Sequence, residues 1–342
     1  MIKMVAAMDR LGTESAFEVL ARANKLSAEG KDIINLGIGQ PDFKTPDHIV
    51  DAAVKALRDG HHGYTPANGI IQCREAVAAD IAERRDVNID PDQIMIVPGG
   101  KVTMFFAIVM FGEQGTEIIY PNPGFPIYES VINFTGAKPV PMALHEANNF
   151  SFSADEVLDL ITPATRLLVI NSPSNPTGGY VPREELDKLA AGLEQHPHVT
   201  VMSDEIYDRL LYDDREHVSM LEYESLRDRL IVLNGWSKTY AMTGWRMGYG
   251  VWPKDLIASA TRLSINCHSC VNAAAQFAGV AALTGPQDAV DEMVAAFDER
   301  RQVIMRELNE IPGFSCVEPS GAFYAFPNIS GTQFSAQELQ DR

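Results

Sequence analysis

The stretch Leu233-Asn-Gly-Trp-Ser-Lys238-Thr-Tyr-Ala-Met-Thr-Gly-Trp-Arg246-Met-Gly-Tyr-Gly250 has four glycines, two tryptophans and two charged residues, both of them cations. It continues an apolar run, Leu230–Leu233, of the kind that forms buried strands. Because small and aromatic residues surround Lys238, we expect its side chain to enter a cleft. Desolvation there favours a neutral amine, which forms Schiff bases with carbonyls. The planar, permanently charged fork of Arg246 suits a phosphate. The alternative is a strand and loop with a surface lysine and arginine, and the rest of the chain decides between the two.

The composition indicates a globular protein with a sizeable core. The chain has 342 residues, of which 46% are hydrophobic, enough for one large domain and a smaller one. A net charge of −18 argues against nucleic-acid and anionic-membrane partners, so an anionic ligand requires a local cationic pocket. The apolar N-terminal run is too short for a signal peptide, and no stretch reaches the length of a membrane span. We therefore expect a cytoplasmic protein with no membrane contact.

No metal site or disulfide framework is expected. The chain has four cysteines, too few for a disulfide scaffold of this size. Cys267-His-Ser-Cys270 has the spacing of redox and zinc motifs, but no second pair of ligands follows at zinc spacing. The pair His61-His62 also lacks a third ligand and is interpreted as part of a solvated loop.

Short apolar runs alternate with helical patterns from Gln93 onward. The runs cover 94–97, 117–120, 166–170, 199–202 and 230–233. The helical patterns cover 102–111, 153–161 and 183–195, after two earlier ones at 13–30 and 46–59. This alternation predicts an α/β fold of three layers, α/β/α, in which helices cover both faces of a mainly parallel sheet.

The pattern also predicts two domains. A long helical pattern covers residues 286–308, and a strand pattern follows it at residues 311–317. We expect a large domain over residues 46–309 and a small α+β domain that joins 13–45 to 310–342.

Residues with suitable chemistry follow the first two strands, where ligands of parallel sheets bind. Gly99-Gly100 precedes Lys101 at the start of a helix, and such a glycine turn presents backbone amides to a phosphate. Phe125 follows the second strand and can stack on a flat heterocycle. Taken alone, the glycines could form a simple turn and Phe125 could belong to the core.

Two further groups follow the fourth strand, and Lys238 follows the fifth. Asp204 can hold a pyridine nitrogen protonated if it is buried, although a helix cap is the simpler interpretation. Tyr207, three residues later, lies on the same side of a helical turn and can reach a ring hydroxyl. Lys238 can take an aldehyde. Together these are the contacts that pyridoxal 5′-phosphate requires.

The chain resembles the fold-type I, class I/II aminotransferases, close to the prokaryotic aspartate aminotransferase subgroup. The resemblance extends from about residue 13 to the end and rests on three motifs in family order: Asn171-x-Pro-x-Asn175-Pro-Thr-Gly178, Ser203-Asp204-Glu-x-Tyr207 and Ser237-Lys238-(seven residues)-Arg246-x-Gly248-Tyr249. It implies a seven-stranded sheet and a pyridoxal-phosphate-dependent transaminase. Such an enzyme moves an amino group between an L-amino acid and a 2-oxo acid by a ping-pong mechanism.

The resemblance also implies the roles of individual residues. Lys238 matches the Schiff-base lysine, which then acts as general base, and Asp204 matches the partner of the pyridine nitrogen. Asn175 and Tyr207 match the residues that hydrogen-bond the ring oxygen, and Phe125 matches the stacking aromatic. The phosphate site matches Gly99, Gly100, Lys101, Ser237 and Arg246. The expected substrate contacts are Gly39, Lys101, Phe125 and Asn175.

Tyr64 matches a tyrosine that reaches the phosphate of the neighbouring subunit, which implies a homodimer. Two features depart from the family pattern. Gly235 stands where many relatives have a serine, so one phosphate hydroxyl is absent. Relatives also continue well beyond Ser320-Gly-Ala-Phe-Tyr324, and that segment carries the arginine that pairs with the substrate α-carboxylate; Arg342 does not occupy that motif.

The amino donor is the least determined property. Lys101 matches a lysine that faces the distal carboxylate of dicarboxylic substrates, which favours aspartate or glutamate with 2-oxoglutarate. Lys101 could instead only neutralise phosphate, and Phe17 would favour a bulkier apolar donor, as in an aromatic or alanine-type aminotransferase. A pyridoxal-phosphate lyase of the same fold would use nearly the same residues. A ligand-sensing aminotransferase-like domain would need an attached basic DNA-binding module.

Overall fold

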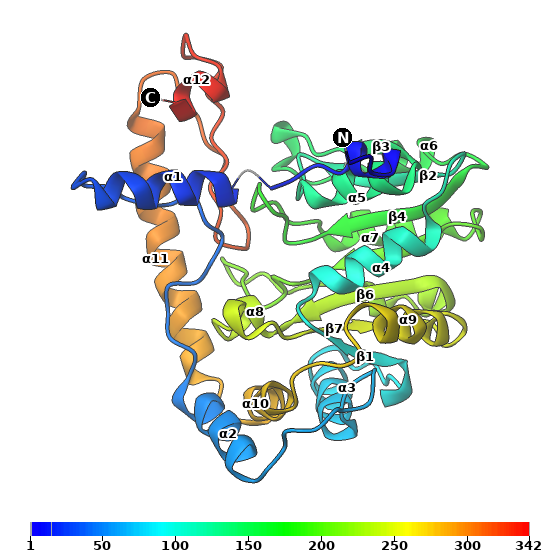
Figure 1. Ribbon diagram of the computed structural model, residues 1–342. Helices are drawn as coiled ribbons and strands as arrows, with labels where there is room; N and C mark the ends of the chain where they lie inside the picture. Colours follow the sequence, from blue (N-terminus) through cyan, green and yellow to red (C-terminus); the bar gives the residue numbers. More distant parts are fainter. Residues whose placement is uncertain (1, 15, 342) are drawn as a thin grey trace.

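The computed structural model describes residues 2–14 and 16–341, and it contains one sheet of seven strands. The strands lie in the order β1-β7-β6-β5-β4-β2-β3 (Figure 1). Their bounds are β1 Ile94–Val97, β2 Glu117–Asn122, β3 Lys138–Ala143, β4 Thr165–Asn171, β5 Thr200–Asp204, β6 Leu230–Gly235 and β7 Gly248–Val251. β7 runs antiparallel to both β1 and β6, and the other neighbours are parallel. The predicted mainly parallel sheet is confirmed.

The register of the central strands aligns their carboxyl ends. Asn171 at the end of β4 lies opposite Asp204 at the end of β5, and Asp204 lies opposite Leu233 in β6. Side chains from three strands therefore meet at one edge of the sheet, which is where ligands bind in folds of this kind.

Helices cover both faces of the sheet, because alternate residues of each strand belong to different apolar clusters. Leu168 and Ile170 of β4 pack on one face, and Leu167 and Val169 pack on the other. The first face is covered by α2 Asp47–Arg58, α3 Ile71–Arg85, α7 Arg183–Leu193 and α10 Ala273–Thr284. The second is covered by α4 Lys101–Phe111, α5 Ile127–Thr135 and α9 Lys254–Cys267. This is the predicted three-layer arrangement.

Several elements complete the chain. In the view of Figure 1, α1 Ala16–Ala28 overlaps α11 Asp288–Glu310 to one side of the sheet, and α12 Ala336–Asp341 lies close to α1. An ion pair between Arg22 and Asp341 joins α1 to α12. The short helices are η1 Ala6–Arg10, η2 Pro91–Gln93, η3 Glu146–Asn148, α6 Ala154–Asp159, η4 Met220–Glu222, η5 Glu224–Arg229, α8 Trp236–Thr239 and η6 Thr243–Trp245. The division into two domains stays a prediction.

The strand expected at 311–317 is wrong. Only Ser315 pairs with another segment, in a single bridge to Asn328. The amide of Cys316 donates to the side-chain oxygen of Asn309 at 2.8 Å, and the Asn309 amide donates to the Cys316 carbonyl at 3.3 Å. Because a side chain satisfies this backbone, the groups that a strand would use are already bonded.

Within residues 2–14 and 16–341, no helix combines the length and apolar character needed to cross a membrane. The four cysteines are free thiols, including Cys267 and Cys270.

Candidate active site

The carboxyl ends of β4, β5 and β6 border a cavity of about 640 Å³. Most of the residues predicted from sequence line it. They are Gly39, Gly100, Lys101, Phe125, Asn175, Asp204, Tyr207, Ser237, Lys238 and Arg246. They come from the loop before α2, from the loops after β2 and β4, from the end of β5 and the turn that follows it, from the start of α4, from α8 and from the end of η6. The fold therefore brings together residues that are far apart in sequence.

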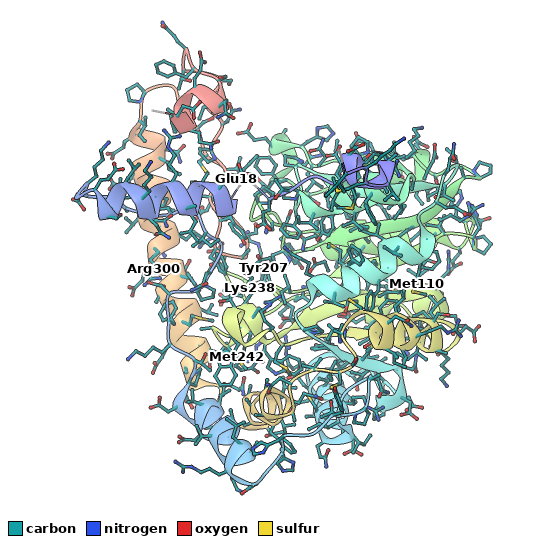
Figure 2. The ribbon with its side chains drawn as sticks, viewed as in Figure 1. Glu18, Met110, Tyr207, Lys238, Met242 and Arg300 are labelled. Atoms are coloured by element: carbon teal, nitrogen blue, oxygen red, sulfur yellow. The ribbon has the colours of Figure 1, made fainter. Side chains whose placement is uncertain are left out.

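Lys238 lies in α8, which follows β6 directly, and its side chain enters the cavity near Tyr207 (Figure 2). Its Nζ donates a hydrogen bond to the Gly39 carbonyl at 2.5 Å and lies 5.8 Å from the centre of the Tyr207 ring. The pKa of Lys238 is lowered to about 8, mainly by burial; the charge of Glu14 opposes this effect and the charge of Arg246 adds to it. A substantial fraction of this amine is therefore neutral close to physiological pH.

Asp204 is the last residue of β5 and is buried at the cavity wall. Its Oδ2 accepts a hydrogen bond from the Tyr128 hydroxyl at 2.6 Å, and its Oδ1 accepts one from the Ile206 amide at 3.3 Å. Burial raises the pKa of Asp204 to about 6, although the Tyr128 bond acts in the opposite direction. In the described part of the chain, Asp204 has no ion-pair partner, so this carboxylate is poised for a cation.

Three polar groups converge beside this carboxylate. The Asn175 backbone is held by the Asn171 side chain, whose Oδ1 accepts from the Asn175 amide at 2.9 Å. The Asn175 side-chain amide donates to the Tyr324 hydroxyl at 3.3 Å. The hydroxyls of Tyr324 and Tyr207 lie 2.6 Å apart. This arrangement can hold an oxygen atom of a ligand between an amide and phenolic hydroxyls.

The beginning of α4 forms an anion site with Arg246. Helix α4 begins at Lys101 with Gly100 as its N-cap, and no side chain caps it, so an anion can bind at this helix end. The amides of Val102 and Thr103 already donate to the carbonyls of Gly99 and Gly100. A Cβ on Gly99 would lie 2.0 Å from Nη2 of Arg246, and Gly99 has a φ of +90°, so only glycine fits there. Ser237 adds a hydroxyl to the same cavity.

Lys101 is paired inside the cavity. Its Nζ donates to Oε2 of Glu14 at 3.2 Å and lies 5.0 Å from the centre of the Phe125 ring. Glu14 comes from the segment before α1 and also lines the cavity.

Comparison with known proteins agrees with this geometry. Residues 31–342 match the family described as aminotransferase class I and II. The chain belongs to this family. It is 37% identical over 328 residues to an aspartate aminotransferase of Bacillus subtilis (strain 168), covering 96% of this chain and 83% of that relative. The family reaction, which this aminotransferase shares, transfers an amino group between an amino acid and a 2-oxo acid.

Solved structures give the same result for the fold. The aspartate aminotransferase from Rhizobium meliloti superposes with a TM-score of 0.92 at 34% identity, covering 97% of this chain and 83% of that one. The Thermus thermophilus aspartate aminotransferase with maleate superposes with a TM-score of 0.90 at 33% identity, covering 96% and 85%. These comparisons show the fold class and the reaction type of this aminotransferase.

Two predicted site residues do not line the cavity. Gly99 lies next to the lining and packs against the guanidinium of Arg246. The side chain of Tyr64 is 95% exposed and contributes nothing to the cavity of its own chain. The side chain of Phe17 and the whole of Arg342 lie outside the described residues.

Three residues that line the cavity and contact the predicted site residues were not predicted from the sequence: Tyr128, Tyr324 and Glu14. Tyr324 lies in a segment that the sequence comparison used only as a landmark. Tyr128 lies three residues after Phe125, and a tyrosine on an apolar helix face reads as core. Glu14 lies at the start of an amphipathic helix pattern, where an acidic residue is expected for local reasons.

Proposed function

We propose that this aminotransferase uses pyridoxal 5′-phosphate to move an amino group between a dicarboxylic amino acid, aspartate or glutamate, and a 2-oxo acid, with 2-oxoglutarate as the acceptor for aspartate. The supporting observation is that one cavity combines the amine of Lys238, the unpaired buried carboxylate of Asp204 and the anion site formed by Gly100 and Arg246. A lysine amine, a buried acid and a phosphate site are the three features that this cofactor needs.

The residues present fit the cofactor. A Cβ on Gly99 would clash with the guanidinium of Arg246, so the glycine lets this cation lie against the turn before α4. This supports a phosphate site made of Gly100, Lys101, Ser237 and Arg246. Asp204 would hold the protonated ring nitrogen, because its carboxylate has no cation partner within the described residues. Asn175 and Tyr207 would hold the ring oxygen, and Phe125 would stack on the ring face.

When bound, pyridoxal phosphate supplies an aldehyde that condenses with amines and a protonated ring that withdraws electrons from the substrate α-carbon. Lys238 would hold the cofactor until the amino group of the substrate takes its place. The released Nζ would then remove the proton from the substrate α-carbon, and its lowered pKa of about 8 makes it a competent base near neutral pH. A second 2-oxo acid reverses these steps, which gives ping-pong kinetics.

The dicarboxylic substrate is supported by Lys101. Its ammonium group reaches into the cavity, where it can meet the distal carboxylate of a donor. The related Thermus enzyme was solved with maleate, a dicarboxylate, and the Bacillus relative is an aspartate aminotransferase. An aromatic or alanine-type donor is the second candidate, because Phe125 also gives the cavity an apolar wall.

The proposal includes a homodimer in the cytoplasm. An exposed Tyr64 is compatible with the idea that it reaches the phosphate site of a neighbouring subunit. The homodimer would then contain two sites, each completed by the other chain.

The experiment is a half-reaction screen on the holoenzyme. Loss of the visible absorbance of the bound cofactor is followed with each amino acid, for the wild type and Lys101→Ala. We expect aspartate and glutamate to react fastest, and Lys101→Ala to slow these two donors selectively. Lys138→Ala, which removes a surface lysine paired with Glu117, is the control. If aspartate and glutamate react no faster than phenylalanine or alanine, the dicarboxylate assignment fails.

A further inference from the structure

Glu14 places a carboxylate of the chain itself inside the cavity. Its Oε2 accepts from Lys101 Nζ at 3.2 Å, and the two side chains are 22% and 45% exposed, respectively. In the part of the chain that the structure describes, Lys101 is the only residue that forms an ion pair with Glu14. The family roles assigned above do not use Glu14.

The charge of Glu14 also acts on other groups around the cavity. It raises the pKa of Lys238 against the larger effect of burial, and it contributes to the raised pKa of Tyr324. Lys238 comes from α8, and Tyr324 comes from the segment after α11. Glu14, Lys238 and Tyr324 all line the cavity, so this carboxylate is part of the cavity wall.

A carboxylate bonded to Lys101 has the same chemistry as the distal carboxylate of a dicarboxylic donor. Both are anions that bind the same ammonium group, and two carboxylates brought to one ammonium repel each other, so binding of one weakens binding of the other. A partly exposed ion pair of this type is weak, changing an equilibrium constant by at most about fivefold. A substrate carboxylate can therefore displace Glu14, but must compete with it.

We infer that Glu14 is a specificity-determining residue that competes with the distal carboxylate of the substrate for Lys101. The inference rests on the proposed function of Lys101. A dicarboxylic substrate exchanges places with Glu14, whereas a monocarboxylic substrate leaves the Glu14–Lys101 pair intact. Glu14 therefore weakens the preference for dicarboxylic substrates and widens the range of donors.

The test measures ligand binding to the holoenzyme by titration calorimetry at low ionic strength. The two probes are maleate, a dicarboxylate, and 3-phenylpropionate, a monocarboxylate; neither has an amino group to transfer. Glu14→Gln keeps the size of the side chain and removes its charge. Glu18→Gln is the control, because Glu18 is exposed on α1 and does not line the cavity (Figure 2).

We expect Glu14→Gln to tighten maleate binding about two- to fivefold, in line with the strength of a partly exposed ion pair, and to leave 3-phenylpropionate unchanged. Glu14→Ala should act in the same direction, and Glu18→Gln should change neither ligand. In a Lys101→Met background, Glu14→Gln should no longer improve maleate binding, because the competition needs the ammonium group.

Three results would overturn the inference: equal changes for both ligands, weaker maleate binding, or an improvement that persists without Lys101. Amino transfer from aspartate by the wild type is measured in parallel. If the wild type transfers no amino group from aspartate or glutamate, the proposed substrate is wrong. If it does, and the selectivity of Glu14→Gln is unchanged, only the role of Glu14 is wrong.

Discussion

Asp204 and Asp208 lie four residues apart and are both 7% exposed, but their surroundings differ. Asp204 borders the cavity, and burial raises its pKa to about 6. Burial would also raise the pKa of Asp208, but the charges of Arg84 and Arg85 overcome that effect and hold the pKa well below its usual range. Oδ2 of Asp208 accepts from Nη2 of Arg84 at 2.8 Å and from Nη2 of Arg85 at 3.0 Å.

The difference separates a functional carboxylate from a structural one. Asp208 receives its cations from the chain itself, so the ion cluster of Asp208, Arg84 and Arg85 is complete without a ligand. Asp204 is equally buried, but its close partner is the neutral hydroxyl of Tyr128. A buried carboxylate without a cation is costly, and a ligand with a positive charge at this point removes the cost.

The largest expected effect is the loss of activity when Lys238, which lines the cavity beside Asp204, is replaced. Lys238→Ala should abolish amino transfer and the visible absorbance of the bound cofactor, because it removes the amine that would hold the cofactor and move the proton. Activity and absorption spectra measure both. Lys188→Ala, which removes a lysine paired with Glu185 on the surface, should change neither. Wild-type turnover by Lys238→Ala would remove Lys238 from the mechanism.

Asp204→Asn should lower kcat by roughly 10²–10³-fold, since losing one partner of a buried ion pair costs about 3–5 kcal/mol.

The same substitution should stabilise the cofactor-free protein. The raised pKa means that the charged form of Asp204 disfavours folding; this cost is absent below pH 3.8 and complete above about pH 6. At pH 7, removing the charge of Asp204 by the asparagine substitution should raise the free energy of unfolding by up to about 3 kcal/mol. Denaturant unfolding of the cofactor-free protein measures it, and a less stable Asp204→Asn would contradict the comparison.

Asp208→Asn should have the opposite effects, a loss of stability with little change in kcat. It leaves Arg84 and Arg85 without their carboxylate, which should lower the free energy of unfolding by about 3–5 kcal/mol while kcat of the folded enzyme changes little. Because the folded pKa of Asp208 is depressed, its stabilising effect is complete above the usual value of 3.8 and is lost as the pH falls below it. The wild type and Asp208→Asn should therefore converge in stability at acid pH. A constant difference from pH 7 to pH 3 would argue against the ion cluster as its cause.

Tyr128→Phe should have the smallest effect of the four. It removes the 2.6 Å bond that lowers the pKa of Asp204, so this pKa should rise above about 6 and the acid limb of the rate profile should move to higher pH. A hydrogen bond to a charged group contributes about 1.5–3 kcal/mol, which sets an upper range of roughly 10- to 150-fold for the loss of kcat at neutral pH. Tyr180→Phe, whose hydroxyl bonds the Glu216 carbonyl on the surface, is the control. An unshifted pH profile would show that Tyr128 does not tune Asp204.

The sequence alone was sufficient for the framework of the sheet and for most of the cavity. Apolar runs at strand length and the residues that follow them are local patterns, and in a parallel sheet the carboxyl ends of strands meet at one edge. This is why Lys101, Asp204 and Lys238 could be placed together before the fold was known.

Local patterns failed where another segment determined the conformation. β3 contains Pro139 and Pro141, which oppose a strand prediction but are tolerated because β3 pairs only with β2 at the edge of the sheet. β7 begins at Gly248, where a Cβ would lie 2.2 Å from the Gly100 amide, so a glycine-rich run reads as a loop although it forms a strand. The expected strand at 311–317 was wrong because Asn309 binds the Cys316 backbone.

Only the tertiary structure decided which charged groups have partners. Asp204 and Asp208 have the same side chain and the same burial, and Arg84 lies 124 residues before the carboxylate that it binds. Glu14 likewise reaches Lys101 across 87 residues. The pKa of a buried acid depends on the charges within a few ångströms, and the packing of distant segments determines those charges. The sequence determined which chemical groups line up along the edge of the sheet, and the fold determined which of them are left free to bind a ligand.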